Sequence, residues 1–426
     1  MGLLLIIYVM NFVDRQVVNI LAEPIRNELG LLDWHIGAMS GLAFALFYTV
    51  LGLPIARLAE RGHRPYIIAV ALAVWSGFTA LCGLAQNFTQ LVLARIGVGV
   101  GEAGCTPPAH SLITDYVPKE RRASALAFYS MGTPLGSLVG MALGGIVADA
   151  YGWRMAFLVC GVPGIVLAII AALTLVEPRI RAAAADIKAR TQALPKPKPF
   201  REALATLTKK RTFWLVAFAA AIKAFIGYGH APFTASFFYR NHTEEIGQLA
   251  AIFGLQAGGF LGLALGTVAG LGGAFGAYMG GVIADRFGSK DFRAYVSVPA
   301  IASLITIPIY IFAVTLPFAS FAILTLTLNA ILGTLWYGPV YATAQSIVPP
   351  HMRATASAVL LFVINLVGLG LGPLAVGALS DVLAIQMGLG AAEGIRWALI
   401  LSALAGVGAF LLFWLARRTI REEMEG

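Results

Sequence analysis

Long apolar stretches separated by short polar segments run along the whole chain of 426 residues. A helix that crosses a bilayer needs about 20 mostly apolar residues, because its backbone groups must pair with one another within a hydrocarbon layer about 30 Å thick. Twelve stretches meet this length, at roughly 1–22, 34–57, 64–85, 88–116, 121–150, 154–176, 212–239, 246–284, 292–314, 317–347, 352–381 and 392–416. The eighth is too long for one straight span, so we expect an interfacial segment before it or a break near its start. The pattern predicts an all-α polytopic membrane protein with 12 transmembrane helices.

Composition supports this class and excludes several others. Hydrophobic residues make up 59% of the chain and charged residues only 12%, whereas soluble domains carry about 25% charged residues. A cytosolic enzyme of this length, a disordered protein and a nucleic-acid-binding domain are therefore excluded. The three cysteines, Cys82, Cys105 and Cys160, all lie in apolar stretches, which predicts neither a disulfide framework nor a metal site. We expect no cofactor other than protons.

The positive charges give the orientation of the spans. The net charge is +9, from 30 basic and 21 acidic residues. Of the basic residues, 23 fall in the even-numbered connections and the C-terminal tail, four fall on the opposite face, and Arg15, Arg95 and Lys223 fall inside spans. The positive-inside rule then places both termini and the long middle connection in the cytoplasm, as in a multi-pass protein of the inner or plasma membrane. Insertion explains the net charge, and we expect no nucleic-acid partner.

Residues 177–208 form the one polar linker, between an N-terminal half at 1–176 and a C-terminal half at 209–426. The run Pro195-Lys-Pro-Lys-Pro199 disfavours helix. Beyond it, Phe200, Leu204 and Leu207 recur at helical spacing beside basic residues. This spacing predicts a short amphipathic helix on the cytoplasmic interface.

The two halves repeat each other. Leu58-Ala-Glu60-Arg61 after the second span matches Ile283-Ala-Asp285-Arg286 after the eighth, 225 positions later. Three further matches pair Val117-Pro118 with Val348-Pro349, Gly145-Ile-Val-Ala-Asp149 with Gly377-Ala-Leu-Ser-Asp381, and Arg154-Met-Ala156 with Arg396-Trp-Ala398. Two six-helix halves in the same orientation, joined by a cytoplasmic linker, resemble the major facilitator superfamily. That resemblance implies a substrate site near the bilayer midplane, between two halves that rock against each other.

The acidic–arginine pairs after the second and eighth spans resemble the cytoplasmic gate motif of that superfamily. We expect Glu60 near the positive end of a neighbouring helix, and Arg61 or Arg64 paired with Asp115 at the base of the fourth span. In the second half, Asp285 and Arg286 repeat the motif, but Ser346 stands where Asp115 would be expected. The second gate is therefore expected to be built differently.

Glycines at intervals of four mark two spans. Gly132, Gly136, Gly140 and Gly144 follow this spacing on the fifth span, and Gly258, Gly262, Gly266 and Gly270 follow it on the eighth. Such small residues let membrane helices approach closely. We interpret both series as packing surfaces that permit the halves to rock.

Charged residues inside the membrane are costly and mark candidate functional positions. The first span holds Tyr8, Asn11, Asp14 and Arg15, and the fourth holds Arg95 and Glu102, seven residues apart on one helix face. We expect the four charges to face one water-filled space. The alternative is a buried ion-pair network that only stabilises the half. Lys223 on the seventh span is a weaker candidate, and His230 is more consistent with a hydrogen-bonded packing residue.

These two motifs narrow the resemblance. Tyr8-x-x-Asn11-Phe-x-Asp14-Arg15, together with Arg95-x-Gly-x-Gly-x-Gly-Glu102, is similar to the Spinster family, the sphingolipid and lysolipid branch of the superfamily. The resemblance implies transport of a lysolipid such as sphingosine-1-phosphate, in some members coupled to protons, by a monomer.

From the residues we expect Asp14 and Glu102 to take up protons, and Tyr8, Asn11, Arg15, Arg95 and Lys223 to bind substrate. A carboxylate that gains a proton would release an arginine to bind a phosphate group. A proton-coupled carrier of a small organic anion or drug would use similar charges and remains the alternative. A lipid enzyme is disfavoured because the chain has neither His-Glu-x-x-His nor a Ser/His/Asp grouping, and a receptor would not need the repeated gates.

Overall fold

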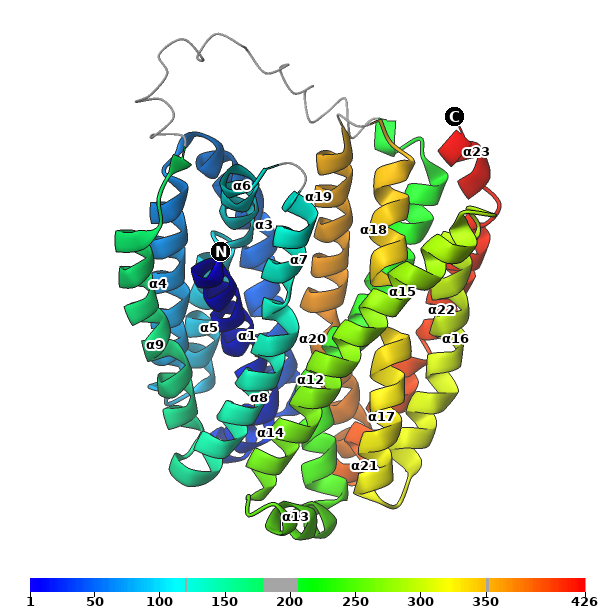
Figure 1. Cartoon of the computed structure of the whole chain (residues 1–426). Helices are drawn as coiled ribbons and strands as arrows, with labels where there is room; N and C mark the ends of the chain where they lie inside the picture. Colours follow the sequence, from blue (N-terminus) through cyan, green and yellow to red (C-terminus); the bar gives the residue numbers. More distant parts are fainter. Residues whose placement is uncertain (119–120, 179–205, 350–351, 426) are drawn as a thin grey trace.

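Two bundles of helices stand side by side in the computed structural model, which describes residues 1–118, 121–178, 206–349 and 352–425 (Figure 1). The N-terminal half is coloured blue to teal and the C-terminal half green to red. We use "linker end" for the end that holds Thr174 and Arg211, which flank the linker, and "far end" for the opposite one. Described residues are helices and connecting turns, which confirms the all-α prediction.

The N-terminal half contains five helices that are long and apolar enough to span a membrane, together with the shorter pair α5 (Phe88–Glu102) and α6 (Thr106–Tyr116). Its helices are α1 (Gly2–Leu29), α2 (Asp33–Gly37), the π-helical turn η1 (Ala38–Leu42), α3 (Ala43–Arg61), α4 (Arg64–Cys82), α5, α6, α7 (Arg122–Ser130), α8 (Gly132–Tyr151) and α9 (Trp153–Thr174). Helices α2, η1 and α3 run on as the second span, and α7 and α8 form the fifth.

The C-terminal half repeats this order. Its elements are α12 (Arg211–Asn241), α13 (Thr243–Ile252), α14 (Ala257–Thr267), η4 (Val268–Gly272), α15 (Gly273–Gly288), α16 (Ala294–Thr315), α17 (Ala319–Gly333), α18 (Tyr337–Ser346), α19 (Arg353–Val363), η6 (Ile364–Leu371), α20 (Gly372–Asp381), η7 (Val382–Gln386), α21 (Gly390–Ala403), α22 (Gly406–Ala416) and α23 (Ile420–Glu425). The break expected in the eighth span is present: α13 lies across the far end, and α14 then begins the span proper (Figure 1).

Eleven helices of the described chain are long and apolar enough to cross a membrane. The fourth predicted span, at 88–116, is the one missing from these eleven, because a turn at residues 103–105 divides it between α5 and α6. Pro107 and Pro108 follow this turn at the start of α6. Proline is tolerated in the first turn of a helix, because the backbone N–H that it lacks would have no partner within the helix there. The turn comes directly after Glu102, the last residue of α5.

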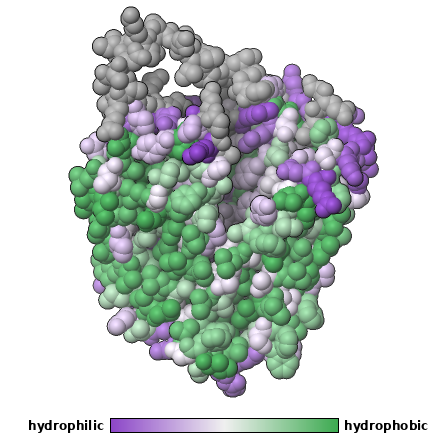
Figure 2. All heavy atoms as spheres, in the orientation of Figure 1, coloured by the Kyte–Doolittle hydropathy of each residue, from purple (hydrophilic) through white to green (hydrophobic). Residues whose placement is uncertain are grey.

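The apolar core is distributed unequally between the two ends. At the far end, one core cluster draws residues from both halves, such as Val17 and Phe157 from the first and Phe233 and Ile395 from the second. At the linker end each half has its own cluster, with Leu369 the one buried residue that the C-terminal half adds to the other's cluster. Figure 2 shows apolar side chains over most of the visible face and a hollow between the halves near the linker end. The halves are therefore joined at the far end and separated at the linker end.

Both predicted glycine series are packing surfaces. A Cβ atom at Gly136 would lie 2.5 Å from the carbonyl oxygen of Val9, so this series lets α8 contact α1 within the first half. A Cβ atom at Gly262 would lie 2.1 Å from the carbonyl oxygen of Met141, so the other series lets α14 contact α8 across the halves. Of the two series, only the one on α14 lies at a contact between the halves, which would change if the halves rock against each other.

The predicted amphipathic segment lies largely outside the described residues. Leu207, the last of its three apolar positions, is buried in the core of the C-terminal half, and its carbonyl oxygen accepts a hydrogen bond from Trp214 Nε1 at 3.1 Å.

Candidate functional site

Close packing of α5 brings the first-half charges together. A Cβ atom at Gly99 would lie 2.6 Å from the carbonyl oxygen of Phe44 on α3, and one at Gly101 would lie 2.5 Å from the backbone nitrogen of Trp75 on α4. The glycines therefore let α5 sit directly against the backbones of both neighbours. This packing presents Arg95 and Glu102 to α1.

Arg15 on α1 and Glu102 on α5 form an ion pair. Arg15 Nε donates to Glu102 Oε2 at 3.0 Å, and the Nη2 group contacts the same oxygen. The guanidinium also lies over three aromatic rings, with its Cζ atom 4.8 Å from the ring centres of Phe44 and Tyr48 and 5.3 Å from that of Phe12. The Glu102 side chain is fully buried, whereas that of Arg15 is 13% exposed. Arg15 is therefore the more exposed partner of the pair.

Asp14 and Arg95 lie deeper in the half and do not form a carboxylate–guanidinium contact. Arg95 Nη1 lies 3.4 Å from the backbone oxygen of Asp14, and Arg95 is 1% exposed. The Asp14 side chain is buried beside Trp75 and Thr79, and neither of its oxygens accepts a hydrogen bond of standard geometry within the described chain.

Tyr8 and Asn11 lie on α1 beside the cluster of charged side chains just described. Asn11 is buried next to Glu102. Tyr8 stacks on Tyr129, with ring centres 4.3 Å apart. The sequence thus correctly places the two motifs in contact, α1 against α5.

The expectation that all four charges face a water-filled space is wrong for this arrangement. A cavity of about 310 Å³ lies between the halves, but none of Asp14, Arg15, Arg95 and Glu102 is among its lining residues. Aromatic side chains such as Phe44 and Trp75 cover the charged group instead, and both are fully buried. From α1 the cavity receives Gln16 and Asn19. Their side chains hydrogen bond to each other, with Asn19 Nδ2 donating to Gln16 Oε1 at 2.5 Å.

Lys223 on α12 lines this cavity, as do His230, Tyr310 and Asn329. The Lys223 ammonium donates to Thr306 Oγ1 at 3.3 Å. His230 Nε2 lies 2.9 Å from Ser402 Oγ, and the His230 ring stacks on Tyr310. His230 is thus a hydrogen-bonded packing residue that also contacts the cavity.

At the linker end, Arg64 is the centre of the first-half gate. Its Nη1 donates to Asp115 Oδ2 at 2.7 Å and to Ser111 Oγ at 2.9 Å, as the motif predicts. Arg64 also holds Glu177 through Nε at 3.0 Å and a second contact from Nη2. Glu177 was not predicted as a partner. The side chains of Glu60 and Arg61 lie outside the described part of the structure.

The second gate differs from the first, as predicted from Ser346, which stands where the repeat would place a counterpart of Asp115. Asp285 accepts a hydrogen bond from the Tyr295 hydroxyl at 2.8 Å, and Arg286 is exposed without an ion pair among the described residues. Asp291 instead pairs with Arg421 of α23 at 3.0 Å. A backbone hydrogen bond from Arg293, together with Arg421, lowers the pKa of Asp291.

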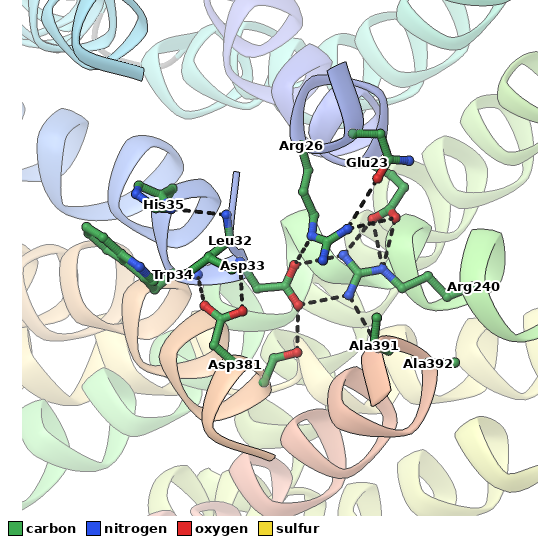
Figure 3. A network of polar contacts seen from close by, with 12 residues as sticks. Glu23, Arg26, Leu32, Asp33, Trp34, His35, Arg240, Asp381, Ala391 and Ala392 are labelled. Atoms are coloured by element: carbon green, nitrogen blue, oxygen red, sulfur yellow. Dashed lines mark hydrogen bonds and ion pairs between the residues drawn. The ribbon is translucent and has the colours of Figure 1, made fainter. Parts of the chain in front are cut away.

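At the far end, a charged network joins the halves (Figure 3). Arg240 of α12 donates to Glu23 of α1 at 2.6 Å and to Asp33 of α2 at 2.7 Å, and Arg26 contacts Asp33 at 2.9 Å. Ser380 Oγ of α20 donates to Asp33 at 2.6 Å. Arg240 was predicted only as a topology charge, although Glu23 and Asp33 on the same charge-poor face were a signal for it.

Two aspartates join the halves by capping helices at this end. Asp381 accepts from the backbone amides of Asp33 and Trp34 at 3.0 and 2.8 Å, at the start of α2. Asp149 accepts from the amides of Gly258 and Gly259 at 3.2 and 2.6 Å, at the start of α14. Within the described residues, the hydrogen bonds and ion pairs between the halves all lie at this end.

Comparison with known proteins agrees with this architecture. The family model of the Major Facilitator Superfamily matches residues 4–373. The chain belongs to the Major Facilitator Superfamily. A curated relative, an MFS-type efflux pump of Mycolicibacterium smegmatis, is 33% identical over 99% of this chain and 94% of its own length. Protein spinster of Drosophila melanogaster is 24% identical over 87% of this chain, which covers 60% of that protein.

Solved structures identify the branch of the superfamily that this chain resembles in structure. A bacterial homologue of the human lysosomal transporter Spinster, in an inward-facing and unoccupied conformation, superposes with a TM-score of 0.84 at 31% identity, covering 99% of this chain and 97% of that one. The occupied, inward-facing form of such a homologue gives 0.81 at 32% identity, over 99% of this chain and 97% of that one. This major facilitator is therefore of Spinster type, and its relatives are transporters and efflux pumps rather than enzymes.

Proposed function

We propose that this transporter is a proton-coupled, alternating-access carrier of an amphiphile with an acidic headgroup, of the lysolipid or sphingosine-1-phosphate type. It would work as a monomer, with substrate in the cavity between the halves. The likeness to Drosophila spinster and to a bacterial Spinster homologue supports this class of substrate. The apolar walls of the cavity and the hollow at the linker end are consistent with an amphiphile that enters between the halves (Figure 2).

The distribution of lysine and arginine supports an orientation with the linker end and both termini in the cytoplasm. In that orientation, the described conformation is open to the cytoplasm and closed on the other side. Substrate would be captured or released on the cytoplasmic side in this state. Transport then requires the far-end contacts to break and the linker ends of the two halves to meet.

The Arg15–Glu102 ion pair is the observation that carries the proton-coupling proposal. Glu102 is buried and its partner Arg15 is partly exposed, so a change of charge at the carboxylate alters the contacts of a partly exposed guanidinium. A proton that binds Glu102 removes its negative charge and with it the ionic part of the contact. Arg15 then keeps its charge and its planar array of donors, which can bind a phosphate or carboxylate group of the substrate.

Asp14 has a separate place in this proposal. Its carboxyl lies in an apolar setting beside Trp75 and Thr79, where the charged form is poorly solvated. We place a second proton there, with Arg95 as the buried positive charge that accompanies Asp14. A local movement of α1 against α5 within the N-terminal half would open the path by which this proton exchanges.

A small organic anion or drug is the second candidate substrate. The cavity volume of about 310 Å³ lies at the lower end of the range for small-molecule pockets. The relative in M. smegmatis is named an MFS-type efflux pump. Both observations fit a compact substrate as well as the headgroup of a lipid.

Purified protein in sealed liposomes with an imposed pH gradient tests the proposal. Labelled lysophosphatidate and sphingosine-1-phosphate are compared with a panel of small aromatic carboxylates and cationic drugs. Accumulation of the lysolipids that depends on the gradient is the expected result. Transport of the small anions alone would favour the second candidate, and absence of any transport would contradict the carrier function.

A further inference from the structure

Among the described residues that line the cavity between the halves, one carries a charged side chain, and it belongs to the C-terminal half. Lys223 of α12 is 7% exposed and lines the cavity. Gln16 and Asn19, the α1 residues in the wall, are neutral, and the remaining wall is largely apolar or aromatic. The positive charge is therefore presented to a cavity of about 310 Å³.

Lys223 has no carboxylate partner among the described residues. Its one hydrogen bond is to the neutral hydroxyl Thr306 Oγ1, at 3.3 Å. An ammonium group has three donors, so two are left for another group. A buried cation without a counter-charge is costly, and an anion that binds in the cavity would remove that cost.

Two further polar atoms, on residues of the cavity wall, are poorly paired. The side-chain oxygen of Asn329 is buried without a hydrogen bond in the described chain. The buried hydroxyl of Tyr310 lies near Thr234 but makes no hydrogen bond of standard geometry in the described chain. Both residues line the same cavity as Lys223. A buried polar atom without a partner costs free energy and calls for an explanation. A ligand with an acidic group and an adjacent hydroxyl or amide would supply partners for these atoms and for the ammonium.

This position is distinct from the Arg15–Glu102 pair. Arg15 is on α1 of the first half, whereas Lys223, Tyr310 and Asn329 are on α12, α16 and α17 of the second. Tyr228 on α12 connects the two positions. It lines the same cavity as Lys223, and it is close enough to Arg15 for an electrostatic interaction. A substrate that bridges both positions would touch both halves at once.

We propose that Lys223 is an anion subsite in the C-terminal half that holds a carboxylate or phosphate group of the substrate, with Tyr310 and Asn329 as hydrogen-bonding neighbours. This inference rests on the proposed carrier function and names the chemistry of its ligand. It predicts that acidic amphiphiles bind much better than neutral ones with the same alkyl chain. It also predicts that the preference depends on Lys223 even while Arg15 is paired with Glu102.

Calorimetric titration of the full-length protein in nanodiscs tests this subsite. The probes are dodecyl phosphate, dodecanoate and the neutral dodecylglycerol. Lys223→Met removes the charge and keeps the length of the side chain, and Lys223→Arg keeps the charge. Lys209→Met is the matched control, because Lys209 is exposed in the same half and does not line the cavity.

Lys223→Met is expected to weaken binding of the two acidic probes by about 10- to 100-fold, the range for a hydrogen bond to a charged group. Dodecylglycerol should bind to this variant within about twofold of wild type, and Lys223→Arg should recover most of the loss for dodecyl phosphate. Lys209→Met should bind all three probes as wild type does. A larger effect on dodecyl phosphate than on dodecanoate would assign the subsite to phosphate.

Two results would overturn the proposal. Unchanged binding of acidic probes to Lys223→Met would show that Lys223 holds no anion, and equal loss for the neutral probe would show a purely structural role. Gradient-driven transport of dodecyl phosphate by the wild type in liposomes separates these outcomes from failure of the carrier itself. If the wild type neither binds nor transports an acidic amphiphile, the proposed function fails and this inference fails with it.

Discussion

Asp149 and Asp381 hold equivalent positions in the two halves, and each caps a helix that belongs to the other half. Asp381 accepts from the amides of Asp33 and Trp34, and Asp149 accepts from those of Gly258 and Gly259. Asp33 and Gly258 are 225 positions apart in the chain, the same offset that relates the second and eighth spans. The far end is therefore closed by two matching contacts related by the repeat.

This arrangement uses the free amides that every helix presents at its first turn. A carboxylate there satisfies two donors and lies at the positive end of the helix dipole. Since α2 and α14 each begin at the far end, both caps must break when that end opens. The caps thus stabilise the described conformation without contact to the substrate.

Neutralisation of either cap is expected to favour opening of the far end. Asp381→Asn and Asp149→Asn should each cost about 1 kcal/mol of closed-state stability, about a fivefold shift in the ratio of closed to open. The two effects should add in the double variant, because one movement breaks both caps. Spin labels at the exposed positions Tyr151 and Ile252, one in each half, report the far-end distance by electron resonance.

Glu393→Gln is the control for these variants, because Glu393 pairs with Arg396 within its own half. It should leave the distance distribution unchanged. A wild-type distribution in the double aspartate variant would contradict the role of the caps.

The glycine surface of α14 gives a second prediction. Gly262→Ala would place a Cβ atom 2.1 Å from the carbonyl oxygen of Met141, so α14 and α8 must move apart at a cost of about 1–3 kcal/mol. The same labels should then show a larger population with the far end open. Gly281→Ala is the matched control, because an added Cβ there meets nothing within 4 Å. Equal distance distributions for the Gly262→Ala and Gly281→Ala variants would contradict a close contact between α14 and α8.

Arg64 gives a prediction about stability. Its guanidinium is fully buried and holds Glu177, which is 5% exposed, as well as Asp115. Arg64→Ala leaves a buried carboxylate without this guanidinium and should destabilise the protein by about 3 kcal/mol or more. Thermal denaturation of detergent-purified protein measures the effect. Arg154→Ala breaks an exposed pair with Glu28 and should change stability by less than about 1 kcal/mol; a similar loss in both variants would refute the distinction.

The sequence was sufficient for the parts of the fold that depend on local pattern. Span length, the repeated motifs and lysine–arginine counts predicted the two halves and the break before α14. The break between α5 and α6 was missed, although Pro107 and Pro108 offered a local signal. The Arg64–Asp115 pair followed from the motif, but Glu177 did not, because its carboxylate reaches Arg64 only through the packing of α9 against α4.

The candidate site was harder to predict for a physical reason. Helical spacing shows which residues share a face, and it correctly grouped Asn11, Arg15 and Glu102. It does not show what covers that face, and Phe44 and Trp75 come from other helices. The four charges were therefore predicted to face a water-filled space, whereas Gln16 and Asn19 on the adjoining face line the cavity.

The central claim is that a proton on Glu102 frees Arg15, and the pH dependence of transport in Glu102→Gln tests it most directly. In liposomes with labelled lysophosphatidate, this variant should keep its thermal stability and lose the dependence of uptake on the pH gradient, because its side chain cannot exchange a proton. Asp14→Asn should lose that dependence as well. Wild-type pH dependence in both variants would contradict the account.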